Sequence, residues 1–156
     1  MNIVILDDYQ DAVRKLACAE KLEPYPAKVY TNTVKGVGQL SVRLRDADVL
    51  VLIRERTQFP KQLLEKLPKL KLIAQTGRVG AHIDVEACSR RGVAVAEGAG
   101  YPPATSEFTW LLILAAMRRL PAYMANLYAG AWQQSVPARP DGPLAGLGSA
   151  LAGKSL

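Results

Sequence analysis

Short apolar runs alternate with amphipathic segments over the first hundred residues of the chain. The runs are rich in β-branched residues and predict buried strands at residues 3–6, 28–30, 49–53, 70–74 and 93–95. The segments between them predict helices from about residue 11 and at residues 38–45, 60–67 and 84–90. Apolar strands separated by amphipathic helices are typical of a parallel sheet with helices on both faces. We therefore predict an α/β fold, a doubly wound parallel sheet, for residues 1–100.

The pattern changes after Pro103. Residues 104–119 predict a helix that is apolar on almost every side, and such a helix is usually buried in a larger assembly. Pro121 breaks or restarts this helix, which continues to about Gly130. Residues 136–148 are rich in Pro and Gly and predict an exposed connector. The chain is therefore expected to divide into residues 1–100 and residues 101–156.

Composition and charge exclude several classes of protein. The net charge is +6, from 20 basic and 14 acidic residues, but the basic residues are scattered, so nucleic-acid binding is not expected. Cys18 and Cys88 lie far apart and His82 is the only histidine, so no metal site is expected. The apolar run at 110–117 is much shorter than the ~20 residues that cross a bilayer, and the first residues predict a strand rather than a signal peptide. We expect a cytoplasmic protein with no membrane partner.

In open parallel sheets, ligands bind beyond the carboxyl ends of the strands, here at the loops 54–60, 76–82 and 97–103. The two glycines within residues 76–80 permit a close approach of the backbone to a ligand. Successive amides in this turn can hold an anion, and Arg78 adds a forked donor. The alternative is an ordinary strand-to-helix turn with a surface arginine.

Two further residues are candidates for this edge. Arg54 directly follows the strongest predicted strand, and its guanidinium could bind a small carboxylate or phosphate. The alternative is an Arg54–Glu55 surface pair of little energetic value. His82 could serve as a general base, but no carboxylate is placed by sequence to orient it, so we favour a capping or surface role.

The segment Gly148 to Ser155 satisfies the pattern G-x-x-x-x-G-K-S of a P-loop. A working P-loop needs a buried strand before it and a helix after it, because the helix N-terminus holds the phosphates. The preceding residues are rich in Pro and Gly instead. A nucleotide triphosphatase is therefore not favoured.

The segment from Leu70 to Arg119 resembles the D-isomer-specific 2-hydroxyacid dehydrogenases, the family of phosphoglycerate, formate and D-lactate dehydrogenases. The resemblance extends over essentially the whole chain. It rests on the order and spacing of Arg54 with Thr57, Leu70 to Ala74, Gly77, Ile83-Asp84, Ala87, Arg91 to Val93, Ser106-Glu107, the apolar helix to Arg118, Gly130 to Trp132, and Leu151 to Leu156.

The resemblance implies a two-domain organisation. Residues 1–100 would form a flavodoxin-like substrate domain. Residues 101–156 would begin the dinucleotide-binding Rossmann domain, with the crossover helices and a connector that end before its first strand. The helical region 104–132 would build a homodimer interface.

The same resemblance implies the functional residues. Arg54, Gly77, Arg78 and Val79 would bind the substrate, and Arg78 and Thr105 would approach the cofactor, NAD or NADP. The family's catalytic Arg, Glu and His would lie downstream of this chain, and His82 does not match that histidine. Arg78 replaces a small or apolar residue of the family, and Ala96 and Tyr101 stand where the family often has Asn. A different substrate preference is therefore expected.

The function that follows is the N-terminal portion of an oxidoreductase. The whole enzyme would transfer a hydride between NAD(P) and a small 2-hydroxy or 2-oxo acid, and this portion alone would be inactive. The alternative is a complete flavodoxin-like binding or interaction module without catalysis. In that case the apolar helix from Ala104 would need a partner, because large apolar patches rarely face water.

Overall fold

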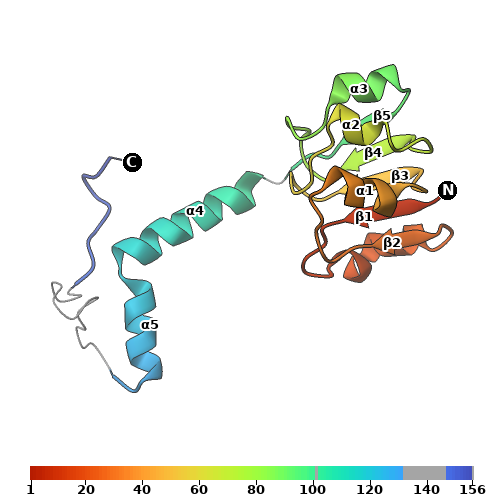
Figure 1. Cartoon of the computed structure of the whole chain (residues 1–156). Coiled ribbons are helices and arrows are strands. Elements are labelled where there is room, and N and C mark those ends of the chain that lie inside the picture. The colour runs from red at the N-terminus through yellow and green to blue at the C-terminus, as the bar shows by residue number, and fades with distance from the viewer. Residues whose placement is uncertain (101, 132–146, 156) are drawn as a thin grey trace. The chain divides into compact units, whose positions relative to one another are not determined.

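The computed structural model describes residues 1–100, 102–131 and 147–155. The chain divides into two compact units, Met1–Gly100 and Tyr101–Leu156, which are described separately below. Figure 1 shows the sheet of the first unit and the helices of the second. Most of the predicted connector, together with Tyr101, Trp132 and Leu156, lies outside the described residues.

The first unit contains a five-stranded sheet in which every strand pair is parallel. The strands are β1 (Ile3–Leu6), β2 (Ala27–Val29), β3 (Val49–Leu52), β4 (Leu72–Gln75) and β5 (Ala94–Glu97), in the spatial order β2-β1-β3-β4-β5. The register places Leu6 beside Leu52, Leu52 beside Gln75, and Gln75 beside Glu97. Four strands therefore end at the same level, and the predicted parallel α/β fold is confirmed.

Three short α-helices cover one face of this sheet: α1 (Val37–Leu44), α2 (Lys61–Leu64) and α3 (Val85–Arg90). The connections β3–α2–β4 and β4–α3–β5 step across the sheet in the same direction, and right-handed crossovers then place both helices on the same face. The main core lies between these layers. Its fully buried members include Leu44, Leu50, Leu64, Ile73 and Cys88.

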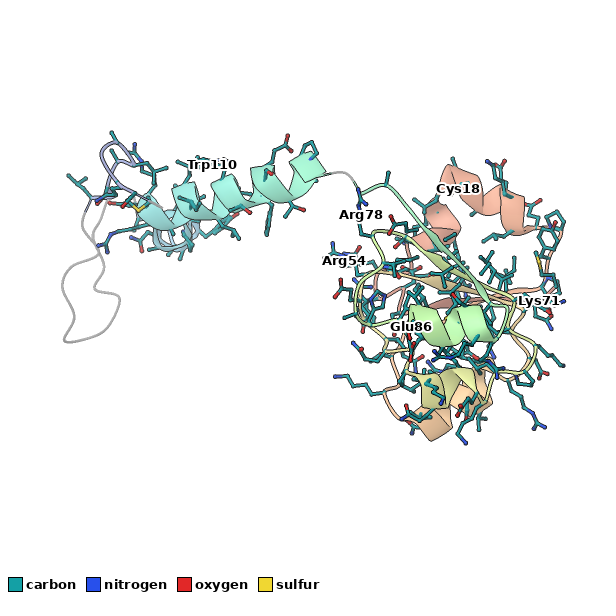
Figure 2. The ribbon with its side chains drawn as sticks, turned by 90° about the horizontal axis from the view of Figure 1, so that it is seen from above. Cys18, Arg54, Lys71, Arg78, Glu86 and Trp110 are labelled. Atoms are coloured by element: carbon teal, nitrogen blue, oxygen red, sulfur yellow. The ribbon has the colours of Figure 1, made fainter. Side chains whose placement is uncertain are left out.

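The opposite face is covered differently from the prediction. The expected α-helix from residue 11 is replaced by two 3-10 helices, η1 (Val13–Lys15) and η2 (Ala17–Leu22), and Figure 2 shows Cys18 of η2 on the side of the sheet away from Glu86 of α3. Leu16 has an extended backbone between them, and neither 3-10 helix has a buried residue. A short helix gains most of its stability from packing, so the prediction was wrong because this segment buries too little surface.

The helix α2 is also shorter than the predicted range 60–67. Lys66 N–H donates to the carbonyl of Leu63 at 2.9 Å and Leu67 N–H to that of Leu64 at 3.1 Å, which is the tighter i→i−3 pattern of a 3-10 turn. The turn still buries Leu67 completely. The predicted helix therefore continues beyond Leu64 as a 3-10 turn.

The second unit contains α4 (Pro102–Met117) and α5 (Leu120–Tyr128). The helix breaks at Arg119, which has a left-handed φ of 55°, and Pro121 lies in the first turn of α5. Residues 147–155 contain neither strand nor helix. No helix of the described residues is long and apolar enough to cross a membrane. Large apolar side chains are exposed on both helices, among them Phe108, Trp110, Leu111, Leu112, Leu127 and Tyr128.

Candidate functional site

The carboxyl ends of β1, β3, β4 and β5 carry most of the polar residues that the sequence singles out. Figure 2 shows Arg54 and Arg78 near each other at one end of the sheet and Lys71 at the other. Arg54 follows β3 and Arg78 follows β4, two strands that are neighbours in the sheet. The structure therefore brings these two predicted residues to one edge.

Asp7, which follows β1, makes hydrogen bonds that connect the end of β1 to the loop after β3. It is 3% exposed and has a left-handed φ of 60°. Its carboxylate accepts a hydrogen bond from the Thr57 hydroxyl, and its carbonyl accepts one from the Arg56 guanidinium. The same guanidinium lies 4.3 Å from the centre of the Tyr9 ring. Thr57 and Arg56 are thus occupied in holding the loop after β3 to the end of β1.

Arg54 is held by its backbone and leaves its side chain free. It has a left-handed φ of 57°, and its carbonyl accepts a hydrogen bond from Gln75 Nε2 at 3.1 Å. The side chain is exposed, and no residue of 1–100 makes a hydrogen bond or ion pair with its guanidinium. The alternative of an Arg54–Glu55 pair is not seen in this unit. A guanidinium at this edge is available to a bound anion.

His82 lies beneath this loop and is 3% exposed, so the predicted surface role is wrong. The capping role is also wrong, because Asp84 caps α3 by accepting from the Ala87 amide at 2.8 Å. A parallel bridge between Phe59 and Ile83 draws the segment inward, and the Phe59 amide donates to the His82 carbonyl at 2.7 Å. Sequence reasoning missed this because the bridge joins two loops that are distant along the chain.

His82 and Gln75 form a short buried chain of hydrogen bonds. Gln75 Nε2 donates to Arg54, so Gln75 Oε1 faces His82 Nε2 at 3.2 Å and must accept from it. His82 therefore carries its proton on Nε2. Its Nδ1 is buried and has no hydrogen-bond partner among the described residues. The position of a Cβ atom on Gly80 would lie 3.4 Å from this Nδ1 and 2.6 Å from Glu55 Oε1, so both groups face the same turn.

The turn after β4 already holds a carboxylate. Val79 N–H donates to Glu97 Oε2 at 2.9 Å, and Arg78 Nη1 lies 3.4 Å from Glu97 Oε1. The amides of Gly77, Arg78 and Gly80 make no hydrogen bond to a residue of the described chain. The turn thus presents several unpaired N–H groups beside an arginine, which is the arrangement expected of an anion site.

Gly98 sets the approach of β5 to this turn. Its amide donates to the carbonyls of Gln75 at 3.0 Å and Gly77 at 3.1 Å. A Cβ atom at Gly98 would lie 2.9 Å from the Thr76 carbonyl oxygen, closer than such contacts occur. Glycine is therefore needed here for a close backbone approach, and this approach places Glu97 against Val79.

The remaining predicted residue, Thr105, lies in the second unit. It is an exposed residue of α4, and its carbonyl accepts a hydrogen bond from the Thr109 hydroxyl at 2.8 Å. Its role beside a cofactor remains a prediction. No group of three or more His, Cys, Asp or Glu side chains in the described residues could hold a metal ion.

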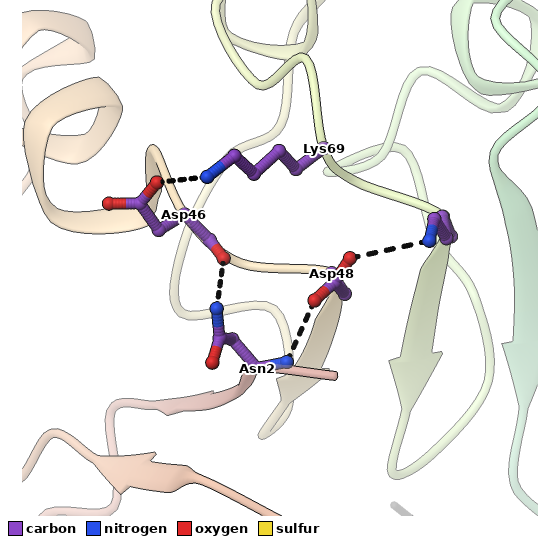
Figure 3. Close-up of polar contacts among 5 residues, drawn as sticks. Asn2, Asp46, Asp48 and Lys69 are labelled. Atoms are coloured by element: carbon purple, nitrogen blue, oxygen red, sulfur yellow. Dashed lines mark hydrogen bonds and ion pairs between the residues drawn. The ribbon is translucent and has the colours of Figure 1, made fainter.

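The opposite, amino-terminal edge of the sheet carries a different polar cluster, shown in Figure 3. A hydrogen bond from Lys69 at 2.6 Å lowers the pKa of Asp46. The Asn2 amide donates to the Asp48 carboxylate at 2.8 Å and lowers the pKa of Asp48, with a smaller effect of Lys71. These contacts fix the starts of three strands and are remote from the candidate site.

The comparisons with known proteins identify the family of this chain. The family model for "D-isomer specific 2-hydroxyacid dehydrogenase, catalytic domain" matches residues 3–143. D-3-phosphoglycerate dehydrogenase of Methanocaldococcus jannaschii is 34% identical over 86% of this chain and 24% of its own length. Glyoxylate reductase of Thermococcus litoralis is 36% identical over 76% of this chain and 35% of its own length.

A solved structure agrees with this assignment. Phosphoglycerate oxidoreductase from Vibrio cholerae O395 is 47% identical, with a TM-score of 0.85, over 99% of this chain and 47% of that chain. The chain thus spans about a quarter to a third of the two curated relatives and about half of the solved one. By its sequence and its fold, the chain belongs to the D-isomer specific 2-hydroxyacid dehydrogenase family.

Proposed function

We propose that this chain is the N-terminal, substrate-binding portion of an oxidoreductase that acts on a small 2-hydroxy or 2-oxo acid. Residues 1–100 would form the substrate domain, and residues 101–156 would begin the dinucleotide-binding domain. One observation carries the proposal. The turn at residues 77–80 offers unpaired amides beside Arg78, and the free guanidinium of Arg54 lies at the same edge of the sheet.

In the proposed role, the substrate carboxylate accepts hydrogen bonds from the amides of the 77–80 turn. Arg54 adds a positive charge, and a charged donor roughly doubles the strength of such a bond. The buried Gln75–His82 pair holds the Arg54 carbonyl in place, so it orients the loop that carries this arginine. Arg54, Gly77, Arg78 and Val79 are therefore the proposed substrate-binding residues.

The redox chemistry would come from a nicotinamide cofactor, because members of this family use NAD(H). Reduced cofactor would give a hydride to C2 of the 2-oxo acid, and a proton would go to its carbonyl oxygen, so that a 2-hydroxy acid forms. Arg78 and Thr105 are the residues proposed to approach the cofactor, which is NAD or NADP. The catalytic Arg, Glu and His are expected outside these 156 residues, so we expect no hydride transfer from this chain alone.

We also propose a homodimer that forms through the helical region 104–132. Support comes from the exposed apolar side chains of α4, where Trp110, Leu111 and Leu112 are 50–55% exposed. Burial of such a surface is favourable by about 25 cal/mol per Å². The same surface supports the second candidate, an interaction module that binds another protein. Sedimentation of the isolated chain tests the dimer, since a monomer at all concentrations would contradict it.

A cytoplasmic location is proposed on the basis of the metabolic role.

Carboxylate binding at the turn can be tested by NMR. We expect pyruvate to shift the amide resonances of Gly77, Arg78 and Gly80 in the 156-residue chain, and the uncharged ester methyl pyruvate to leave them unchanged. Arg54→Gln should weaken pyruvate binding several-fold. Arg45→Gln is the matched control, because Arg45 is an exposed arginine that follows α1 and leads into the amino end of β3. Equal shifts with the ester would refute a carboxylate site.

A further inference from the structure

We propose that Glu97 is an internal ligand of the substrate-carboxylate position, which an incoming acid must displace. The inference rests on the proposed function, since it concerns the same turn. Glu97 would thereby set how tightly, and for which acids, the site binds. Its carboxylate is the same chemical group as the one that the substrate would present.

The backbone of β5 holds Glu97 beside the turn at residues 77–80. Glu97 lies beside Gln75 in the parallel register, and the next residue, Gly98, donates to the carbonyls of both Gln75 and Gly77. The Glu97 backbone is therefore fixed within reach of the turn. One carboxylate oxygen accepts from the Val79 amide at 2.9 Å, and the other lies 3.4 Å from Arg78 Nη1.

The ion pair between Arg78 and Glu97 is weak enough to break when a substrate binds. The Arg78 side chain is 86% exposed and that of Glu97 is 45% exposed, and ion pairs between exposed side chains are weak because water solvates both partners and salt screens them. Glu97 can swing into water while its backbone stays in place. Val79 N–H and the Arg78 guanidinium then become available to the substrate carboxylate.

The exchange of one carboxylate for another has two consequences. In the absence of substrate, the Glu97 carboxylate compensates the positive charge of the turn. Inorganic anions therefore compete less well for the site. The affinity for a monocarboxylate is reduced, because part of the binding free energy is used to displace Glu97. Removal of the Glu97 charge should therefore tighten substrate binding, whereas removal of a residue with a purely supporting role would weaken it.

The experiment is a pyruvate titration of the 156-residue chain at constant ionic strength, followed through the amides of Gly77, Arg78 and Gly80. Glu97→Ala should lower the dissociation constant about tenfold, which corresponds to about 1.4 kcal/mol, near the lower end for hydrogen bonds to charged groups. Glu97→Gln should fall between this variant and the native chain, because its amide oxygen still accepts from Val79 but carries no charge.

Glu86→Gln is the matched control. Glu86 pairs with Arg90 at 3.3 Å on α3, and its side chain is 89% exposed, so the variant removes the same charge from a similar ion pair elsewhere. We expect its affinity for pyruvate to equal that of the native chain. If Glu86→Gln and Glu97→Gln increased the affinity for pyruvate equally, the increase would come from the change in net charge. This result would overturn the proposal.

The remaining outcomes separate this inference from the proposed function. If the native chain binds pyruvate at the turn and both Glu97 variants bind equally well or more weakly, Glu97 is no competitor and only this inference fails. If no variant binds pyruvate at the turn, the carboxylate site itself is wrong and both fail. Dispersed amide spectra and unchanged melting temperatures in the variants establish that the fold is intact.

Discussion

The hydrogen-bond chain from His82 through Gln75 to Arg54 makes a quantitative prediction about stability. The perturbation is Gln75→Leu, which keeps the size of the side chain and removes its amide. Gln75 is 4% exposed and His82 is 3% exposed, so water cannot replace the acceptor that His82 Nε2 loses. A buried donor left without a partner costs about 1–3 kcal/mol. The Arg54 carbonyl also loses its donor, but it lies in an exposed loop where water can replace it. We expect a loss of about 2 kcal/mol.

The partner variant His82→Phe should cost much less, within about 1 kcal/mol. This change leaves Gln75 Oε1 without a donor, but it also removes Nδ1, a buried acceptor that has no partner among the described residues in the native chain. One unsatisfied buried atom is thus exchanged for another. The double variant removes both polar groups, so we expect it to be more stable than the sum of the single changes predicts, by about 1–2 kcal/mol.

The assay is urea unfolding at pH 7, followed through the amide peak intensities of Val4, Leu50 and Ile73, which report on the sheet of the first unit alone. Gln62→Leu is the control, because Gln62 is an exposed glutamine on α2 and its substitution should change stability by less than about 0.5 kcal/mol. Equal losses for Gln75→Leu and His82→Phe, or strictly additive energies in the double variant, would refute the assignment of the proton to Nε2 and the hydrogen-bond chain with it.

Three further predictions concern the core, the amino-terminal edge and the cysteines. Phe59 is fully buried and its backbone bridges two loops of the site, so Phe59→Ala should cost about 3–5 kcal/mol in urea unfolding and broaden the amides of the 77–80 turn; a loss below about 1 kcal/mol would contradict this packing. The pKa of Asp48 is lowered in the fold, so its stabilising contribution is complete above the unfolded value of about 3.9 and is lost as pH falls through the lower folded value. Thermal melts between pH 7 and 2 should therefore decline less steeply for Asp48→Asn than for the native chain, and parallel curves would count against the contact with Asn2. Cys18 is exposed, whereas Cys88 is buried with a raised pKa because burial disfavours its thiolate. A thiol-reactive dye should label Cys18 rapidly in the folded chain and Cys88 only on unfolding, and rapid labelling of both would show that the core is open.

The sequence predicted β1 and β3 well because both strands consist entirely of apolar residues and are buried along most of their length. Val49–Leu52 is the clearest case, with Leu50 completely buried in the centre of the sheet. A helix from about residue 11 was predicted from the local pattern alone, whereas the structure has two 3-10 helices there. The actual conformation of this segment depends on the Asp8 carboxylate, which accepts from the amides of Ala12 and Val13, and on the extended backbone at Leu16. Neither feature has a periodic signature.

The candidate site, like the fold, was predictable only in part. Topology alone brings Arg54 and the 77–80 turn to one edge, because parallel strands that are neighbours in the sheet end together, and this part was predictable. The partners of these residues were not. Thr57 bonds to Asp7 across 50 positions of sequence, and His82 is buried by a bridge between two loops. Such contacts depend on the register of the sheet and on side-chain reach, which a single sequence does not contain.

The position of Glu97 follows from the register of the sheet, which the sequence alone does not contain. The residue ends β5, and every parallel strand beside β4 must place its last side chains near the turn that follows β4. In the proposed site, a carboxylate in that position faces the amides that would bind the substrate carboxylate, and it would compete with the substrate electrostatically. A neutral side chain there would leave the Val79 amide open to any anion. In the proposed site, the identity of the residue at this one strand end would therefore control the occupancy of the turn.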